Sequence, residues 1–277
     1  MIVTEGLGKD YRGIVALEDL TLHIRSGEIF GLLGPNGAGK TTTIKILTTL
    51  ARPSRGRAWI QDFDVVRQPL QVKRLIGVCP QEINLDKELT AYENLRIYGQ
   101  LYRVPDLRTR IRELLELGDQ SQRAASLVRE FSGGMQRRLL ILRALMSRPR
   151  VLFLDEPTVG LDPQVRRQLW DLIRQLRADG ITILITTHYI EEAEMLCDRV
   201  GILSHGHLIA LDTPTALTAR VGGYVVESLD GVHRQYILLQ SKEEAYARAR
   251  AEPSGVIIRQ ANLEDVFIKL TGERLQH

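Results

Sequence analysis

The chain has 277 residues, of which 44% are hydrophobic and 26% are charged, and its formal net charge is +3. This composition is typical of a folded globular protein and excludes a disordered or collagen-like chain. The small net charge gives no reason to expect a nucleic-acid partner, because such binding needs basic residues concentrated on one face.

The cysteines and the apolar runs restrict where the protein can work. Cys79 and Cys197 lie in apolar surroundings without a neighbour at metal-ligand spacing, so we expect two buried thiols and no disulfide. Such cysteine usage favours a reducing compartment. The first residues lack an apolar core of signal-peptide length, and no apolar run approaches the roughly 20 residues that span a bilayer. If the protein serves transport, we expect the pore to belong to another chain.

Short apolar runs alternate with helical patterns in the first part of the chain and again after residue 150. The expected strands are residues 29–33, 151–154 and 181–185. The expected helices are one through Thr43, Ile44, Leu47 and Leu50, one over residues 164–178 that ends at Asp179-Gly180, and a short one with Ile190, Ala193 and Cys197 inward. This alternation predicts a parallel sheet flanked by helices, with ligands at the carboxyl ends of the strands.

Two stretches differ from this pattern. Between about Leu85 and Ser147 the chain is rich in Leu, Arg and Glu, so we expect a helical insert. After Thr213-Pro214 the composition changes again, and we expect a small α+β appendix. Its expected strands are residues 224–229, 235–239 and 256–259, and its expected helices are residues 242–251 and 263–270. We therefore divide the chain into residues 1–213 and 214–277.

A glycine-rich turn after the first expected strand has the spacing of a phosphate-binding loop. Its residues match the pattern G-x-x-x-x-G-K-[ST] and are Gly34, Pro35, Asn36, Gly37, Ala38, Gly39, Lys40 and Thr41. The glycines let backbone N–H groups point at a phosphate, and the helix behind them adds its positive dipole end. Lys40 supplies a charge to the β- and γ-phosphates, and the Thr41 hydroxyl can ligate Mg²⁺. We expect this phosphate loop, with Thr42, to bind a nucleotide.

Two adjacent carboxylates follow the apolar run at residues 151–154. Asp155 stands where this architecture places a Mg²⁺-binding carboxylate, and Glu156 comes directly after it. A polar turn would explain the pair alone, but beside a phosphate loop the two residues divide into separate roles. We expect Asp155 to hold the metal and Glu156 to accept a proton from the attacking water.

A second anion site is expected at the start of a helix whose apolar stripe is Met135, Leu139, Leu142 and Met146. The residues Ser132-Gly133-Gly134-Met135-Gln136 begin it, and we name residues 132–136 the signature segment. Ser132 is a good N-cap, and two glycines at a helix start leave backbone N–H groups uncovered. Helix capping alone would explain Ser132 but not the paired glycines.

With this segment the chain resembles the ATP-binding-cassette (ABC) family over residues 2–213. Four further positions match family elements in chain order: Tyr11 the aromatic that stacks on adenine, Gln81 the glutamine that links Mg²⁺ and attacking water to the transmembrane partner, Gly160-Leu161-Asp162 the loop at the dimer interface, and His188 the histidine at the γ-phosphate. Two positions depart from the pattern, Val159 for Ser or Thr and Gln61 for glycine, and neither has a catalytic role in the family.

The resemblance implies an α/β fold of the P-loop NTPase class, with a mostly parallel core sheet, N-terminal antiparallel strands and a helical subdomain at about residues 85–147. It also implies ATP and Mg²⁺, and a homodimer or heterodimer of cassettes in which each ATP lies between the phosphate loop of one and the signature segment of the other. The implied catalytic residues are Lys40, Gln81, Glu156 and His188, and the implied metal ligands are Thr41, Gln81 and Asp155. The implied nucleotide contacts are Tyr11, residues 34–42, Ser132, Gly133, Gly134, Gln136 and Asp162.

The family function is ATP hydrolysis coupled to a separate transmembrane permease, which places the cassette at the cytoplasmic face of the cell membrane. The segment Ala261–Gly272 resembles the tail of prokaryotic export-type cassettes for drugs, antibiotics and lipid-linked saccharides, so export is favoured over import. Two alternatives are a soluble cassette ATPase acting on ribosomes or DNA, and a non-hydrolysing regulatory module. His205-Gly206-His207 is expected to form a hairpin turn and not a metal site.

Overall fold

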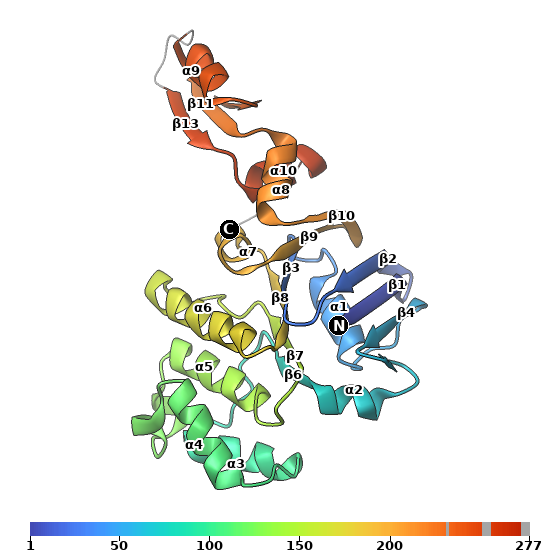
Figure 1. The fold of residues 1–277 in the computed structure, drawn as a ribbon, viewed down its shortest axis with the longest axis vertical. Coiled ribbons are helices and arrows are strands. Elements are labelled where there is room, and N and C mark those ends of the chain that lie inside the picture. Colours follow the sequence, from blue (N-terminus) through green and yellow to red (C-terminus); the bar gives the residue numbers. More distant parts are fainter. Residues whose placement is uncertain (231–232, 251–255, 273–277) are drawn as a thin grey trace.

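A six-stranded sheet forms the centre of the molecule (Figure 1). The computed structural model describes residues 1–230, 233–250 and 256–272. The strand order is β10 (His207–Asp212), β9 (Arg199–Ser204), β3 (Ile29–Leu33), β8 (Thr182–Thr187), β7 (Val151–Asp155) and β6 (Ile76–Cys79). The strands from β9 to β6 pair in parallel, and β10 returns antiparallel to β9. The turn between β9 and β10 is His205-Gly206, which confirms the expected hairpin.

The central strands are apolar because helices or a second sheet cover both of their faces. Every residue of β3, β7 and β8 is buried. Along β3, Phe30 and Leu32 enter one hydrophobic cluster, whereas Ile29 and Leu33 enter the other. The three strands expected here are confirmed, and the sheet with its helices confirms the α/β class.

An antiparallel sheet packs beside the central one and confirms the N-terminal strands that the resemblance implies. Its order is β2 (Ile14–Ile24), β1 (Ile2–Tyr11), β4 (Arg55–Ile60) and β5 (Phe63–Asp64). Two helices accompany it, α1 (Lys40–Leu47) and α2 (Pro69–Leu75). Apolar residues of this sheet, α1 and the central sheet share one hydrophobic cluster.

One helix ends earlier than expected. The prediction that α1 runs through Leu50 is wrong, because the helix ends at Leu47 and Leu50 is 70% exposed. Thr49 adopts a left-handed backbone with a φ of 64°, and the Leu50 N–H turns back to the carbonyl of Lys45. The chain therefore leaves the helix axis before Leu50 can face the core.

Helices fill the region expected to be a helical insert. They are α3 (Ala91–Leu101), α4 (Leu107–Leu117) and α5 (Gly133–Ala144), with short 3₁₀ turns at Ser121–Arg123 and Val128–Glu130. The helices α6 (Pro163–Ala178) and α7 (Ile190–Leu196) cover the same side of the central sheet, and all five share the second hydrophobic cluster. Figure 1 shows α3, α4 and α5 at one end of the molecule.

The appendix stands at the opposite end in Figure 1 and has a sheet of its own. The order is β12 (His233–Leu239), β11 (Tyr224–Asp230) and β13 (Val256–Gln260), and the helices are α8 (Pro214–Val221), α9 (Lys242–Arg250) and α10 (Leu263–Thr271). The elements expected here are confirmed, although residue 251 of the expected helix lies outside the described residues. The last helix, α10, packs on α8 and α7, and the Leu263 N–H donates to Glu194 at 2.8 Å.

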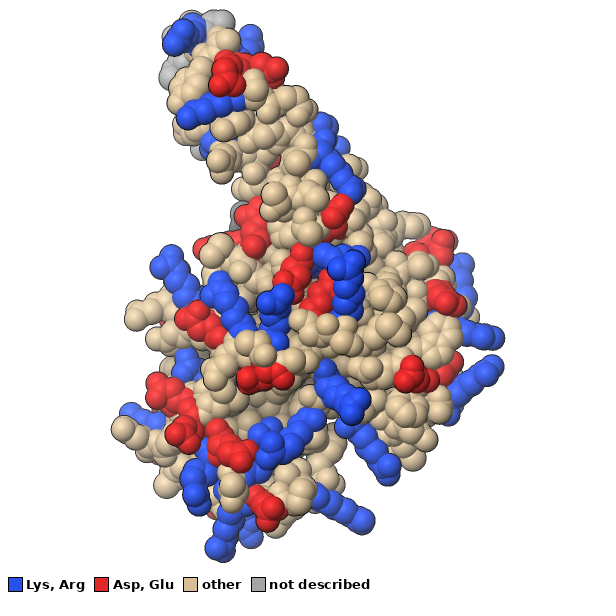
Figure 2. All heavy atoms as spheres, viewed as in Figure 1, with Lys and Arg blue, Asp and Glu red and all other residues tan. Residues whose placement is uncertain are grey.

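The surface and the cysteines agree with the composition. On the face drawn in Figure 2, Lys and Arg are interspersed with Asp and Glu. Cys79 and Cys197 are both buried and unpaired, as expected, with Cys197 one residue beyond α7. Among the residues that the structure describes, none of the helices combines the length and the apolar character that crossing a membrane requires.

Candidate active site

The phosphate loop leaves the carboxyl end of β3 and enters α1, as the sequence predicts. Gly37 and Gly39 have φ angles of 82° and 103°, a left-handed backbone that glycine adopts without strain. A Cβ at Gly34 would lie 2.2 Å from the carbonyl oxygen of Leu203 in β9, so only glycine fits there. The loop is thus shaped by its glycines, and the helix start behind it favours an anion.

Lys40 lies beneath this loop and is only 4% exposed. Its ammonium donates to the carbonyls of Gly34 at 2.7 Å and Pro35 at 3.0 Å, and it pairs with Glu156 at 3.2 Å. Burial lowers the pKa of Lys40, while the charges of Glu156 and Asp155 oppose that shift. The paired carboxylates therefore help to keep a buried cation charged beside the loop.

Asp155 ends β7 and meets two hydroxyl groups. Its Oδ1 accepts from Thr41 at 3.3 Å and from Thr186 of the neighbouring strand β8 at 2.5 Å. Carboxylate, hydroxyl and amide oxygens suit Mg²⁺, which in NTPase sites also keeps waters and substrate phosphates as ligands. Over the described ranges, no group of three or more His, Cys, Asp and Glu residues could hold a metal ion. Asp155 and Thr41 therefore fit a Mg²⁺ ion that takes its other ligands from water and from the substrate's phosphates.

Glu156 follows at the strand end, with a left-handed φ of 46° that is uncommon for a non-glycine residue. Its backbone N–H is held by Thr186, through the carbonyl at 3.1 Å and the hydroxyl at 3.0 Å. Backbone strain of this kind persists where the surroundings fix it, and it gathers at functional sites. The turn aims a buried carboxylate away from the strand and toward Lys40.

Two residues from other elements also reach the Glu156 carboxylate. The side-chain amide of Gln81, two residues after β6, donates to Oε2 at 3.4 Å. Nδ1 of His188, which follows β8, lies 3.2 Å from the same oxygen, but the pair lacks hydrogen-bond geometry. The structure therefore brings four predicted catalytic residues together, since Lys40, Gln81 and His188 all surround Glu156.

The Lys40 cavity is the space above these groups and measures about 350 Å³. It is lined by Tyr11, Ala16, residues 36–42, Gln81 and Glu156. Tyr11 is 41% exposed at the end of β1, with the ammonium of Lys9 4.8 Å from its ring centre. An exposed aromatic ring beside a phosphate-binding loop suits a nucleotide base, which offers a flat face for stacking.

The signature segment forms the start of α5, as predicted. The Ser132 hydroxyl accepts from the Met135 N–H at 3.3 Å, which caps the helix. A Cβ at Gly133 would meet no atom within 4 Å, whereas one at Gly134 would lie 2.3 Å from Cγ1 of Val165 in α6. Gly134 is therefore needed for packing, and Gly133 leaves its backbone open. Gln136 turns inward, and its amide donates to the Phe131 carbonyl at 2.9 Å.

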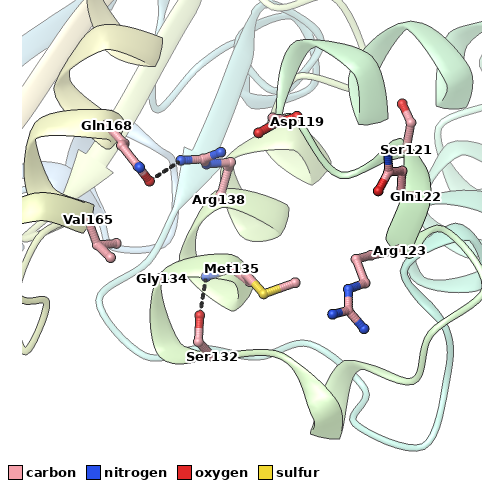
Figure 3. Close-up of a pocket in the computed structure, with 10 residues that line it drawn as sticks. All are labelled: Asp119, Ser121, Gln122, Arg123, Ser132, Gly134, Met135, Arg138, Val165 and Gln168. Atoms are coloured by element: carbon pink, nitrogen blue, oxygen red, sulfur yellow. Dashed lines mark hydrogen bonds between the residues drawn. The ribbon is translucent and has the colours of Figure 1, made fainter.

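A second space, the Ser132 cavity, opens beside this helix start and measures about 470 Å³ (Figure 3). It is lined by Asp119, Ser121, Gln122, Arg123, Ser132, Gly134, Met135, Arg138, Val165 and Gln168. Arg138 donates to Gln168 at 3.1 Å and Arg123 points into the open space in Figure 3. The Ser132 and Lys40 cavities share no lining residue.

The predicted nucleotide contacts are therefore separated within one chain. Tyr11, most of the phosphate loop, Gln81 and Glu156 line the Lys40 cavity, whereas Ser132 and Gly134 line the Ser132 cavity. Gly133, Gln136 and Asp162 line neither of the two. Asp162 instead caps α6, where it accepts from the Val165 N–H at 3.1 Å.

Sequence reasoning missed Thr186 and Ala16. Thr186 holds both Asp155 and Glu156, and Ala16 lines the Lys40 cavity from β2. A polar residue late in an apolar strand is a signal for Thr186, because carboxyl ends of parallel strands carry sites. The signal becomes specific only with the strand order, which places β8 beside β7. No local pattern distinguishes Ala16.

Comparison with known proteins agrees with this geometry. Residues 17–159 match the family model described as ABC transporter. The daunorubicin resistance ATP-binding protein DrrA3 of Streptomyces coeruleorubidus is 38% identical, over 98% of this chain and 96% of its own length. The Nod factor export ATP-binding protein I of Cupriavidus pinatubonensis is 40% identical, over 97% and 90%. The linearmycin resistance ATP-binding protein LnrL of Bacillus subtilis is 39% identical, over 86% and 78%.

Solved structures are similar as well. An ATP-binding cassette solved as a post-hydrolysis dimer with ADP and phosphate matches with a TM-score of 0.70 and 29% identity, over 77% of this chain and 98% of its own. The cassette cbiO1 of Clostridium perfringens, part of a transporter complex, matches with a TM-score of 0.74 and 28% identity, over 79% and 90%. The chain belongs to the ABC transporter family and is an ATP-hydrolysing cassette, the subunit type found in transporters of the exporter kind.

Proposed function

We propose that this chain supplies two half-sites to a pair of cassettes, and that each ATP is hydrolysed between the Lys40 cavity of one subunit and the Ser132 cavity of the other. The separation of the two cavities carries this proposal. A γ-phosphate held over Lys40 leaves the open helix start at Ser132 and Gly133 without an anion of its own. The γ-phosphate held by the partner subunit binds at this helix start. The partner is a second copy or a different cassette.

The chemistry of each composite site follows from the contacts around Glu156. Its carboxylate accepts the proton of the water that attacks the γ-phosphate, and Gln81, whose amide reaches the same carboxylate, orients that water. Lys40 and His188 place positive charge or a hydrogen-bond donor where negative charge develops on the phosphate. Tyr11 stacks on the adenine ring.

The metal in this proposal is Mg²⁺, held by Asp155 and Thr41 with Gln81 nearby. The 3.3 Å contact between the Thr41 hydroxyl and Asp155 supports this assignment, because it brings both oxygens to one place. When bound, Mg²⁺ neutralises phosphate charge and fixes the orientation of the nucleotide. The remaining residues of the set act on the water and the phosphate directly.

The work done by hydrolysis is transport. We propose that the pair docks on a separate transmembrane permease at the cytoplasmic face of the membrane and drives export. The relatives named for Nod factor export and for drug resistance support this direction. In this proposal residues 1–213 are the ATPase domain, with its helical subdomain at about 85–147, and residues 214–277 are an accessory domain. No observation favours ribosomes or DNA as the target.

Glu156→Gln tests the proposal. The substitution removes the proton acceptor and keeps the shape of the side chain, so ATP binding should persist while turnover falls at least about 100-fold. ATP should then hold the variant as a dimer in gel filtration, because the phosphate that joins the subunits is not removed. The wild-type protein, assayed with ATP and with ADP, is the control. Turnover at the wild-type rate in Glu156→Gln would contradict the assignment.

A further inference from the structure

Arg137 is a buried arginine close to the active site that the proposed mechanism does not use. It lies on α5, five residues after Ser132, and is 4% exposed. Its guanidinium donates to the carbonyl of Pro80 at 2.8 Å and to the carbonyl of Gln81 at 2.7 Å. A buried arginine is costly without partners, so these charge-assisted bonds fix both the arginine and the backbone that it contacts.

The backbone that Arg137 holds has no helix or strand of its own. Residues 80–84 lie between the end of β6 at Cys79 and α3, which begins at Ala91. A second arginine of α5, Arg143, donates to the Asn84 carbonyl at 2.9 Å and to the Asn84 side chain, with its guanidinium 5.2 Å from the Tyr98 ring. Two arginines on one helix therefore hold both ends of this five-residue segment.

Gln81 is the residue of this segment that enters the Lys40 cavity. Its side chain is exposed and makes a long hydrogen bond of 3.4 Å to Glu156. The side chain alone does not fix its place, so the position of Gln81 depends on its backbone. That backbone is tied to α5 through Arg137.

The helix α5 begins at the signature segment. One end of it is the anion site of the Ser132 cavity, and the first turns carry the arginine that holds Gln81. A rigid helix that moves when a phosphate reaches Ser132 must carry Arg137 with it. In the proposed pair, that phosphate belongs to one ATP and Gln81 belongs to the site of the other.

We propose that Arg137 is a positioning residue that sets Gln81 according to the state of the signature segment, and so connects the two ATP sites of the pair. The inference rests on the proposed composite sites. It adds a residue to them and a direction for the coupling, from the start of α5 to the catalytic water.

A double-mutant cycle tests whether Arg137 acts through Gln81. Arg137→Gln should lower kcat about 10-fold and change KM for ATP less than about two-fold, because a displaced Gln81 misplaces the water while the Lys40 cavity is intact. Added to Gln81→Ala, it should cause no further loss. A purely structural role predicts multiplied losses, and multiplied losses or wild-type kcat in Arg137→Gln would overturn the proposal.

Arg110→Gln is the matched control. Arg110 is another largely buried arginine of the helical insert that donates to a carbonyl, that of Leu145 at 2.6 Å, but it does not contact residues 80–84. The Arg110→Gln variant should therefore keep the wild-type kcat. Arg137→Lys retains the charge and can reach one carbonyl, so its kcat should lie between those of wild type and Arg137→Gln. It also serves if Arg137→Gln does not fold, and wild-type kcat in Arg137→Lys would then overturn the proposal.

A hydrogen-exchange measurement separates this inference from the proposed function. In the Glu156→Gln background, ATP should protect the amides of residues 81–84 when the dimer forms. With Arg137→Gln added, gel filtration should still show the ATP dimer, but that protection should be lost. Failure of Glu156→Gln alone to form a dimer would count against the composite sites, whereas equal protection with and without Arg137 would count against the link.

Discussion

The Lys40 cavity and the Ser132 cavity differ in what holds their functional groups. In the first, buried charged side chains have partners within the chain, since Lys40 pairs with Glu156 and Asp155 accepts from the Thr186 hydroxyl. In the second, Ser132 and Gly133 are exposed at a helix start, and their environment is open space. The fold therefore preorganises the chemistry in one half and leaves the other half to be completed.

This difference has a physical reason. Buried charges must be paired inside their own chain, because leaving one unpaired costs several kcal/mol. Backbone N–H groups at a helix start can remain in water until an anion arrives. In the proposed pair, a site divided in this way is inactive in a single subunit and active when two subunits close, so the proposal couples hydrolysis to a change of assembly.

The test of this division with the largest expected effect is complementation between two inactive variants. Ser132→Arg blocks the open half and keeps the Lys40 half, while Lys40→Ala does the reverse. Each protein alone should lose at least about 100-fold in turnover, since every composite site contains one defect. A mixture of the two should recover a measurable part of the wild-type rate, because mixed dimers contain one site with two intact halves.

A matched experiment uses the double variant Ser132→Arg/Lys40→Ala mixed with wild type. In those mixed dimers both composite sites carry a defect, so activity should come only from wild-type pairs. ATPase rate against mixing ratio distinguishes the two arrangements. No recovery in the first mixture, together with a rate in the second that is proportional to the wild-type fraction, would mean that each chain builds its sites alone.

The sequence predicted some parts of the two halves better than others. The phosphate loop and the signature segment are continuous, and their glycines have local reasons, such as the left-handed φ of Gly39. The grouping of Gln81 and His188 around Glu156 depends on strand order, which local pattern does not give, and it was expected only through family resemblance. Arg137 carried no signal, because an arginine beside another on a helix usually reaches solvent.

Strands and helices were predicted correctly where the spacing of apolar residues defines them. An element's end was predicted wrongly where backbone geometry, and not apolar spacing, determines it. The strands β3, β7 and β8 are apolar throughout because both faces are covered, so their runs were visible. The end of α1 was misjudged because Thr49, which is a poor choice for a left-handed backbone, terminates the helix before Leu50. The N-terminal sheet was expected only through the resemblance: residues 20–24 of β2 alternate between buried and exposed, but register shifts interrupt the pairing of β1 with β2.

The two signature glycines offer a smaller test, on stability. An alanine methyl group at Gly134 would approach Val165 of α6 to 2.3 Å, so that side chain or α6 must move, whereas one at Gly133 meets nothing within 4 Å. We expect Gly134→Ala to have a free energy of unfolding about 1–3 kcal/mol below that of Gly133→Ala. Urea unfolding measures the difference. Equal stabilities would show that α6 packs more loosely on the open half than the structure implies.

A buried carboxyl group lies on α7, where this helix packs against α6. Glu192 of α7 is fully buried and accepts from the indole of Trp170 in α6 at 3.2 Å. Burial raises the pKa of Glu192, while the nearby hydroxyl groups of Thr187 and Thr158 and the hydrogen bond from Trp170 oppose the shift. Thr158 and Thr187 flank the catalytic residues Glu156 and His188, and α6 lines the Ser132 cavity.

The smallest expected effect is a change of stability with pH at this group. Above the ordinary glutamate pKa of about 4.3 the unfolded chain releases its proton. The folded chain keeps it until its raised pKa, so this group lowers the free energy of unfolding as pH rises through that window. Glu192→Gln stays neutral and keeps the acceptor for Trp170, so its stability relative to wild type should increase as pH rises above about 4.3. Urea midpoints at several pH values measure this, with Glu191→Gln at the exposed neighbouring position as the control. A difference between Glu192→Gln and wild type that does not vary with pH would mean that the folded protein holds Glu192 ionised, and that the contact between α6 and α7 contains a buried charge.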